Sequence, residues 1–192
     1  MTKRIINVFG SSGSGSTTLA KNIAEEYNFY HIDVDDCLWE DTDPPFSHRR
    51  DDALAREILL KEITKADNIV ISGSLVGFGD DIKKLISLFV FINLDISVRI
   101  ERINKREKKR FKSRILPGGD LYQKHLDFLE WVSNYETNPE YIRSRKQHLL
   151  WLEDLNVPVL KGTEELSKKE LLLLGKPFIK TIKESKKFFL LV

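Results

Sequence analysis

A stretch of glycine, serine and threonine near the start of the chain offers the clearest chemistry. It lies between an apolar segment of strand length and a segment of helical period, and it consists of Gly10, Ser11, Ser12, Gly13, Ser14, Gly15, Ser16, Thr17 and Thr18. Such a loop exposes consecutive backbone N–H groups, and the N-terminus of the following helix adds a partial positive charge. The stretch therefore predicts a site for phosphate groups. The alternative, a flexible Gly/Ser linker, fits poorly with a position between strand and helix.

The spacing of this loop matches the Walker A pattern GxxxxGK followed by Ser or Thr, except at one position. Gly10 and Gly15 hold the glycine positions, and Thr17 stands where a hydroxyl coordinates Mg²⁺. Ser16 stands where the pattern has lysine, which reaches the β- and γ-phosphates and offsets charge during phosphoryl transfer. Lys21 lies more than a helical turn further on and around the axis, so it does not replace that lysine. The loop predicts ATP and Mg²⁺ as ligands, and leaves open how phosphotransfer would proceed.

Acidic residues follow the second predicted strand. In open α/β sheets, ligands bind beyond the carboxyl ends of the strands, which places the segment 33–36 beside the phosphate loop. Alternation along an extended chain predicts that Asp33 and Asp35 point to one side. A carboxylate there could hold Mg²⁺ or accept a proton from an attacking hydroxyl. The alternative is an acidic loop whose side chains cap the next helix.

Arginines recur on one predicted helix, at 95–110. Arg99, Arg102 and Arg106 are spaced i, i+3 and i+7, and therefore form one stripe. The apolar face is formed by Ile96, Ile100 and Ile103. We expect the stripe to face a cleft, with a solvated basic face as the alternative.

Two segments are candidates for acceptor binding. Arg49 and Arg50 follow Asp43-Pro44-Pro45-Phe46 and could grip an acceptor phosphate bidentately. They could equally offset the neighbouring acids, in which case the acidic arm would favour a cationic acceptor. Gly73, in the glycine-containing loop 72–80, allows close backbone approach to a substrate. In the same loop, Asp80 is expected to cap the next helix.

Short apolar runs alternate with helical segments, which is the pattern of a parallel α/β sheet. Strands are expected at 4–9, 29–33, 68–72, 88–93 and 157–160, and helices at 16–27, 47–66, 80–86, 95–110, 120–136 and 139–155. We predict a three-layer α/β/α P-loop fold with a five-stranded parallel sheet. The long interval between the last two strands predicts a helical lid insertion. The chain would be a single domain, 1–192, with an acceptor arm at 34–66, a lid at 111–145, and helices from Gly162 to Val192 packed on the domain's edge.

Composition excludes several classes. The chain has 192 residues, is 41% hydrophobic, and carries a formal net charge of +2, which suits a globular domain rather than a disordered chain. Cys37 is the only cysteine, so neither an internal disulfide nor a cysteine-based zinc site can form. No segment has the length of a signal peptide or a membrane span, so we expect a cytoplasmic protein without a membrane partner.

The small net charge hides a strong separation. Residues 33–52 contain eight carboxylates and two arginines, whereas residues 99–114 contain nine basic and two acidic residues. The basic block could suggest nucleic-acid binding. However, Phe111 is its only aromatic residue, and a strongly acidic segment accompanies it in the same chain. The sequence therefore argues against nucleic acid as a partner.

Taken together, these motifs resemble the adenylate-kinase-like P-loop phosphotransferases, the small nucleotide and metabolite kinases. More narrowly, the chain resembles a set of bacterial P-loop proteins of unassigned substrate whose loop reads GSGTTT in place of GSGKST. The matching segments are 10–19, 33–36, 43–46, 72–74, 102–106, 117–120 and 143–145. The resemblance covers most of the chain up to about Gly162.

The resemblance implies roles for several residues. It places Asp33 and Asp35 at metal and substrate, Arg102 near the nucleotide base and Arg106 near the phosphates. Arg143 and Arg145 resemble lid arginines that swing onto the transferring phosphoryl group, and with the helix arginines they are candidates to replace the missing lysine charge. The segment 117–119 would be the lid hinge, and Asp120 the cap of the next helix.

These observations favour an ATP-dependent phosphotransferase acting on a nucleoside monophosphate or a small hydroxylated metabolite. Its partners would be a nucleotide and a small-molecule acceptor. The first alternative is a catalytically weak nucleotide-binding sensor or regulatory protein, in which the lid arginines only close over bound nucleotide. The second is a nucleic-acid-binding accessory protein that uses the basic block.

Overall fold

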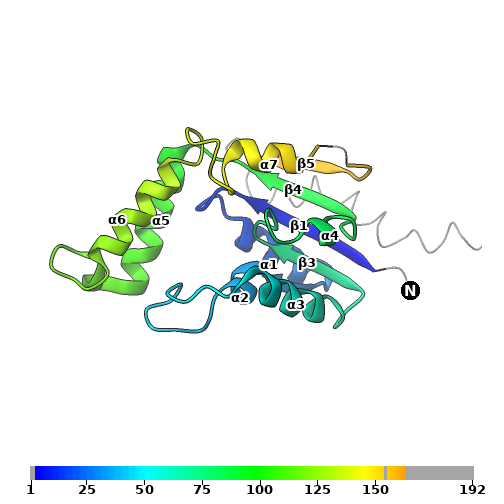
Figure 1. Ribbon diagram of the computed structural model, residues 1–192, viewed down its shortest axis with the longest axis horizontal. Helices are drawn as coiled ribbons and strands as arrows, with labels where there is room; N and C mark the ends of the chain where they lie inside the picture. The colour runs from blue at the N-terminus through cyan, green and yellow to red at the C-terminus, as the bar shows by residue number, and fades with distance from the viewer. Residues whose placement is uncertain (1–2, 154, 163–192) are drawn as a thin grey trace, which may run out of the picture.

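Five strands form one parallel sheet in the computed structural model, which describes residues 3–153 and 155–162 (Figure 1). The strands are β1 (Arg4–Gly10), β2 (Tyr30–Asp33), β3 (Asn68–Ser72), β4 (Leu88–Ile92) and β5 (Val159–Gly162). Their order is β2-β3-β1-β4-β5, and every neighbouring pair is parallel. Ile6, for example, lies opposite Val70 on one side and Leu88 on the other. The carboxyl ends of the strands therefore meet at one edge, where the phosphate loop leaves β1.

The helix predicted at 16–27 has the observed bounds and the one at 95–110 is shifted by one residue, whereas the other four predicted helices are shorter than expected. They are α1 (Ser16–Tyr27), α2 (Val34–Leu38), α3 (Asp52–Ile63), α4 (Asp80–Lys83), α5 (Ile96–Phe111), α6 (Tyr122–Ser133) and α7 (Arg145–Trp151), with a 3₁₀ turn η1 (Lys112–Ile115). The predicted helix at 47–66 begins only at Asp52, because the Asp51 carboxylate accepts from the backbone N–H of Leu54 and caps it there. The short α2 was not predicted. The helices expected after Gly162 lie outside the described residues.

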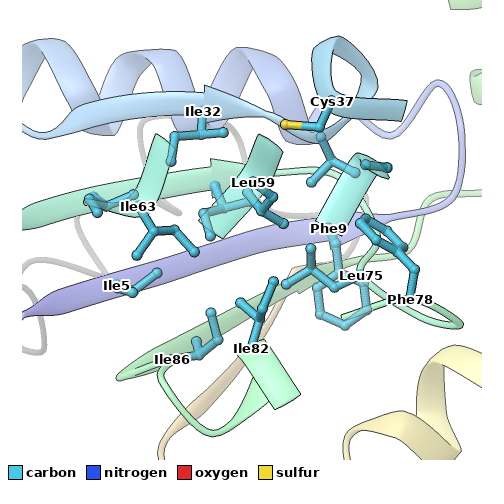
Figure 2. Close-up of a cluster of buried hydrophobic side chains, with 14 of the residues drawn as sticks. Ile5, Phe9, Ile32, Cys37, Leu59, Ile63, Leu75, Phe78, Ile82 and Ile86 are labelled. Carbon is cyan, nitrogen blue, oxygen red and sulfur yellow. The ribbon is translucent and has the colours of Figure 1, made fainter. Parts of the chain in front are cut away.

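Helices cover both faces of the sheet, which confirms the three-layer fold. Side chains alternate along β1, so Ile5 and Phe9 face one layer while Ile6 and Val8 face the other. The first layer contains α2, α3, α4 and α7, and its core is shown in Figure 2, where Phe9 lies among Leu59, Leu75 and Phe78. The second layer packs α1 on the sheet through Leu19, Ala20 and Ile23. Burial on both faces explains why β4 is apolar throughout.

A pair of helices extends from the sheet. Helices α5 and α6 run side by side, joined by the turn at η1, and project away from the strands (Figure 1). We call them the hairpin, residues 96–133. Ile103, Ile115, Leu121 and Val132 are its buried apolar side chains. Within the described part of the chain, no helix is long and apolar enough to cross a membrane.

Candidate functional site

The phosphate loop is shaped by close contacts that only glycine permits. A Cβ on Gly10 would collide with the carbonyl oxygen of Ile92 in the neighbouring strand. Gly13, at φ 84°, would place a Cβ only 2.8 Å from the carbonyl oxygen of Arg99. Gly15, at φ 93°, precedes the first residue of α1 in a left-handed conformation. The loop therefore turns tightly from β1 into the N-terminus of a twelve-residue helix.

Two hydroxyl groups of the loop are buried without a partner. The side chains of Ser11 and Ser14 are 2% and 4% exposed, and neither Oγ atom has a hydrogen-bond partner among the described residues. An unpaired buried polar group costs roughly 1–3 kcal/mol. The cost favours a polar ligand at this loop. Ser16 and Thr17, in the first turn of α1, are half-buried, and Thr18 is exposed.

Asp33 and Asp35 lie at the end of β2, but not in the arrangement that strand alternation predicts. The chain turns into α2 directly after Asp33, whose Oδ1 accepts from the backbone N–H of Asp35 at 3.2 Å and caps the helix. The alternation argument was wrong here, because it extends a strand into residues that are helical. The capping alternative is correct for Asp33. Its carboxylate still lies at the carboxyl edge of the sheet, at the end of β2.

The surroundings of Asp33 and Asp35 raise the pKa of both carboxyl groups. Partial desolvation by surrounding protein atoms raises the pKa of Asp33, although the backbone N–H of Asp35 opposes this rise. Desolvation also raises the pKa of Asp35, and the nearby Asp33 carboxylate raises it further. Arg143 and Arg106 act in the opposite direction on the Asp35 pKa. A carboxyl group held between these influences is suited to take up a proton.

Arg143 is the predicted lid arginine that the fold brings to the acidic edge. It is half-buried and makes no hydrogen bond or ion pair with the residues that the structure describes. Burial lowers its pKa, and the charges of Asp35 and Asp52 oppose that change. Arg49 lies close enough to lower it further. Carboxylates and guanidinium groups from the segments around Asp35, Arg49, Arg106 and Arg143 therefore lie near one another at this edge.

The other predicted substrate-binding residues have partners within the protein. Arg49 Nη2 lies 2.5 Å from Asp52 Oδ1. Arg50 Nη1 donates to the carbonyl oxygens of Asp36 and Cys37, each at 3.2 Å, and to that of Trp39, near the end of α2. Gly73 has φ 105°, and a Cβ there would come within 2.9 Å of Val34. These contacts are structural, and the substrate roles of the three residues stay predictions.

Arg99 does not belong to the exposed basic stripe that its spacing predicts. Its side chain is fully buried, with Nε donating to the Leu94 carbonyl at 2.9 Å and the guanidinium lying 5.2 Å from the Tyr135 ring centroid. Arg106 lies at nearly the same angle around α5 as Arg99, so the two differ in position along the helix rather than around it. Arg99 is near the start of α5, where Leu94 and Tyr135 contact it. Residues 99 and 103 face the protein, whereas Arg102 and Arg106 remain exposed. Only Arg102 and Arg106 are left of the expected stripe.

Two predicted helix caps are also wrong. Asp80 is the first residue of α4 rather than its cap, and its Oδ1 accepts from Trp151 Nε1 at 2.8 Å. Asp120 precedes α6 without capping it, and it pairs with Arg114 at 2.8 Å. The donor to Asp80 lies 71 positions away and the donor to Asp120 lies six positions before it, and local capping rules take neither into account.

A buried polar chain around His148 has no counterpart among the predicted site residues. The two ring nitrogens of His148 are hydrogen-bonded to Tyr135 Oη at 2.8 Å and Ser74 Oγ at 3.0 Å. His31 Nε2 is likewise hydrogen-bonded to Ser72 Oγ at 2.9 Å, beside Asp33. Ser72 and Ser74 flank the predicted Gly73, but a single histidine carries no spacing pattern that would reveal its partner.

The fold and the loop define the class of protein. A parallel sheet with a phosphate loop after β1, and charged side chains at the carboxyl edge, is the architecture of the P-loop kinase-like proteins. A family model described as an AAA domain matches residues 6–120, and the chain belongs to this family.

Relatives and solved structures agree with this assignment. An uncharacterized protein, YqaC of Bacillus subtilis strain 168, is 34% identical over 168 residues, which cover 88% of this chain and 93% of that protein. A cytidylate kinase of Pyrococcus horikoshii is 34% identical over 118 residues, covering 55% of this chain and 58% of the kinase.

The solved structures show the same fold at low sequence identity. A shikimate kinase from Bacteroides thetaiotaomicron has a TM-score of 0.53 at 21% identity, covering 92% of this chain and 98% of its own. A gluconokinase from Sinorhizobium meliloti 1021 has a TM-score of 0.52 at 16% identity, covering 97% of each chain.

Proposed function

We propose that the protein is an ATP-dependent phosphotransferase that transfers the γ-phosphoryl group to a nucleoside monophosphate or a small hydroxylated metabolite. The observation that carries this proposal is the convergence of Asp35 with Arg143 and Arg106 at the carboxyl edge of the sheet that carries the phosphate loop. A carboxylate base, arginine charge and a phosphate cradle are the components that phosphoryl transfer uses. The kinase names among the relatives and solved structures support the same class.

In this proposal the backbone from Gly10 to Thr18 holds the phosphates of ATP. The unpartnered hydroxyl groups of Ser11 and Ser14 fit such a polar ligand. The Thr17 hydroxyl and the Asp33 carboxylate are the candidate Mg²⁺ ligands, since hard oxygen atoms suit this ion. No group of three or more His, Cys, Asp or Glu side chains in the described residues could form a metal site by itself. When bound, Mg²⁺ would supply neutralisation of phosphate charge.

The remaining residues act on the acceptor. With a hydroxylated acceptor, Asp35 takes the proton from the hydroxyl as its oxygen bonds to the γ-phosphorus, and the bond from that phosphorus to the β–γ bridging oxygen breaks to release ADP. Arg106, Arg143 and Arg145 neutralise the charge on the transferring group. Arg49 lies where it could hold an anionic group of the acceptor once it leaves Asp52. The site therefore suits an acceptor that carries a hydroxyl group near Asp35 and an anionic group near Arg49.

The test is the Asp35→Asn variant, with Asp36→Asn as its matched control on the same helix. The wild-type protein is incubated with Mg²⁺ and ATP and a panel of nucleoside monophosphates and hydroxylated metabolites, and ADP formation is followed. We expect turnover with at least one acceptor, and a fall in kcat of roughly 10²- to 10⁴-fold in Asp35→Asn, because general-base contributions have this size. ATP affinity should stay unchanged in both variants.

The absence of the lysine at Ser16 favours one alternative function, a nucleotide-binding sensor. Tight ATP binding without turnover across the whole panel would support the sensor and contradict the phosphotransferase. Equal turnover in Asp35→Asn and wild-type protein would remove Asp35 from the mechanism.

A further inference from the structure

The candidate cations around the phosphate loop differ in what they contact. Arg106 pairs with Glu107 at 3.4 Å, and Arg145 pairs with Glu136 at 3.4 Å. The charge of Arg143 acts on Asp35, and that of Lys21 acts on Asp33 and His31. Each of these four side chains therefore has a carboxylate neighbour that offsets its charge.

Arg102 is different, because its contact is the phosphate loop itself. Its Nη1 donates to the carbonyl oxygen of Ser14 at 3.3 Å, across 88 positions of sequence. It forms no ion pair with a carboxylate in the part of the chain that the structure describes. Its side chain is exposed, and a guanidinium has five N–H donors, so the other donors stay accessible.

The backbone holds Arg102 in this place. A Cβ on Gly13 would lie 2.8 Å from the carbonyl oxygen of Arg99 and 3.1 Å from Ile103 Cδ1. These two residues precede and follow Arg102 on α5, so the helix touches the loop on both sides of it. Both are buried, which fixes the register between helix and loop. The glycine at position 13 is what permits this close approach.

We propose that Arg102 supplies the positive charge that the phosphate loop lacks at Ser16, an inference that rests on the proposed function. A phosphate oxygen is a stronger acceptor for a guanidinium than a peptide carbonyl. Rotation of the side chain therefore exchanges the Ser14 carbonyl for a phosphate of the nucleotide without moving α5. The assignment differs from what family resemblance implies, since that resemblance places Arg102 near the base.

Binding measurements with and without a nucleotide base test this assignment. Wild-type protein, Arg102→Gln, Ser16→Lys and the double variant are titrated calorimetrically with ATP and with inorganic tripolyphosphate, both with Mg²⁺. Lys105→Gln, an exposed cation on the same helix, is the control for charge loss. We expect Arg102→Gln to weaken both ligands by the same factor, about 10- to 100-fold, because one charge-assisted contact to phosphate is lost. Lys105→Gln should leave both affinities near those of the wild type.

The double variant, which loses the Arg102 charge and gains a lysine at position 16, gives a second readout. If Arg102 does the work of the loop lysine, Ser16→Lys should restore most of the lost affinity to the Arg102→Gln variant. A variant that loses ATP affinity but keeps tripolyphosphate affinity would place Arg102 at the base and overturn the inference, as would failure of Ser16→Lys to restore binding. Wild-type protein that binds neither ligand would overturn the proposed function as well. Binding without phosphotransfer would overturn that function alone.

Discussion

The α5–α6 hairpin has a base, where α5 begins and α6 ends, and a tip at the turn η1. An arginine holds each end, but one is buried and the other is exposed to solvent. At the base, Arg99 is fully buried and donates to the carbonyl oxygens of Leu94 and Val132. At the tip, Arg114 reaches Asp120 and Asp43 with all three side chains exposed to solvent. Lys124 adds contacts from the tip to the carbonyl oxygens of residues 45 and 46.

The base is the fixed end of the hairpin. Hydrogen bonds and charges shielded from water are strong and costly to break, whereas exposed ion pairs contribute little and are screened by salt. The base also packs on the phosphate loop at Gly13. Motion of the hairpin would therefore free the tip from the loop 43–47 and leave Arg102 beside the phosphate loop.

The largest expected effect comes from breaking the base. Arg99→Met keeps much of the apolar stem but removes donors to two buried carbonyl oxygens and the contact with Tyr135. We expect the free energy of unfolding to fall by roughly 3 to 4 kcal/mol, which is typical when a buried charged group is removed from its partners. Urea denaturation measures this directly.

Arg102→Met is the matched control, because it lies three residues along the same helix and is exposed. It should unfold at nearly the wild-type urea concentration. Equal stability of Arg99→Met and Arg102→Met would mean that the hairpin base is not anchored by Arg99.

A second prediction concerns the buried histidine beside the base. His148 is 1% exposed, and burial together with the charge of Arg143 lowers its pKa to about 3. The unfolded chain binds a proton near pH 6.5, so this contribution to stability is complete above pH 6.5 and is lost as the pH falls toward 3. The loss approaches about 1.4 kcal/mol per pH unit, or about 2 kcal/mol between pH 6 and pH 4.5.

Unfolding of His148→Gln over the same pH range isolates this contribution. The variant should start less stable at pH 7, because it disturbs the hydrogen bonds to Tyr135 and Ser74, but its stability should fall less steeply. His48→Gln, at an exposed position, should keep the wild-type slope. Parallel slopes for wild type and His148→Gln would contradict a neutral buried imidazole.

Sequence patterns were reliable for the fold because they report burial. The expected helix at 16–27 has the observed bounds, and each expected strand overlaps an observed one, since apolar runs between glycine-rich turns mark strands covered on both faces. The glycine-rich turn after β1 was equally predictable from its motif, although the contacts that require Gly10 and Gly13 come from Ile92 in β4 and Arg99 in α5, far away in the sequence.

Side-chain partners distant in sequence were not predictable. Helical spacing places Arg99 and Arg102 near one another, but it does not say that the boundary between core and solvent runs between them. Asp80 looked like a cap until its partner Trp151, 71 positions away, was known. Asp33 and Asp35 were predicted to point to the same side of an extended chain, because the sequence does not show that β2 ends at Asp33.

The smallest expected effect comes from releasing the hairpin tip. Arg114→Gln removes the exposed pairs with Asp43 and Asp120, so the urea midpoint should move little. Amide hydrogen exchange at residues 43, 46 and 47, which carry the N–H groups of the loop 43–47, should nevertheless become faster, because the tip no longer holds that loop. Lys109→Gln, which removes an exposed cation on α5, should leave the exchange unchanged.

The difference in exchange between Arg114→Gln and wild type should shrink in high salt, since screening weakens the wild-type pairs as well. A drop in stability as large as that of Arg99→Met would show that base and tip are held with equal strength, and the distinction between a fixed end and a free end would fail.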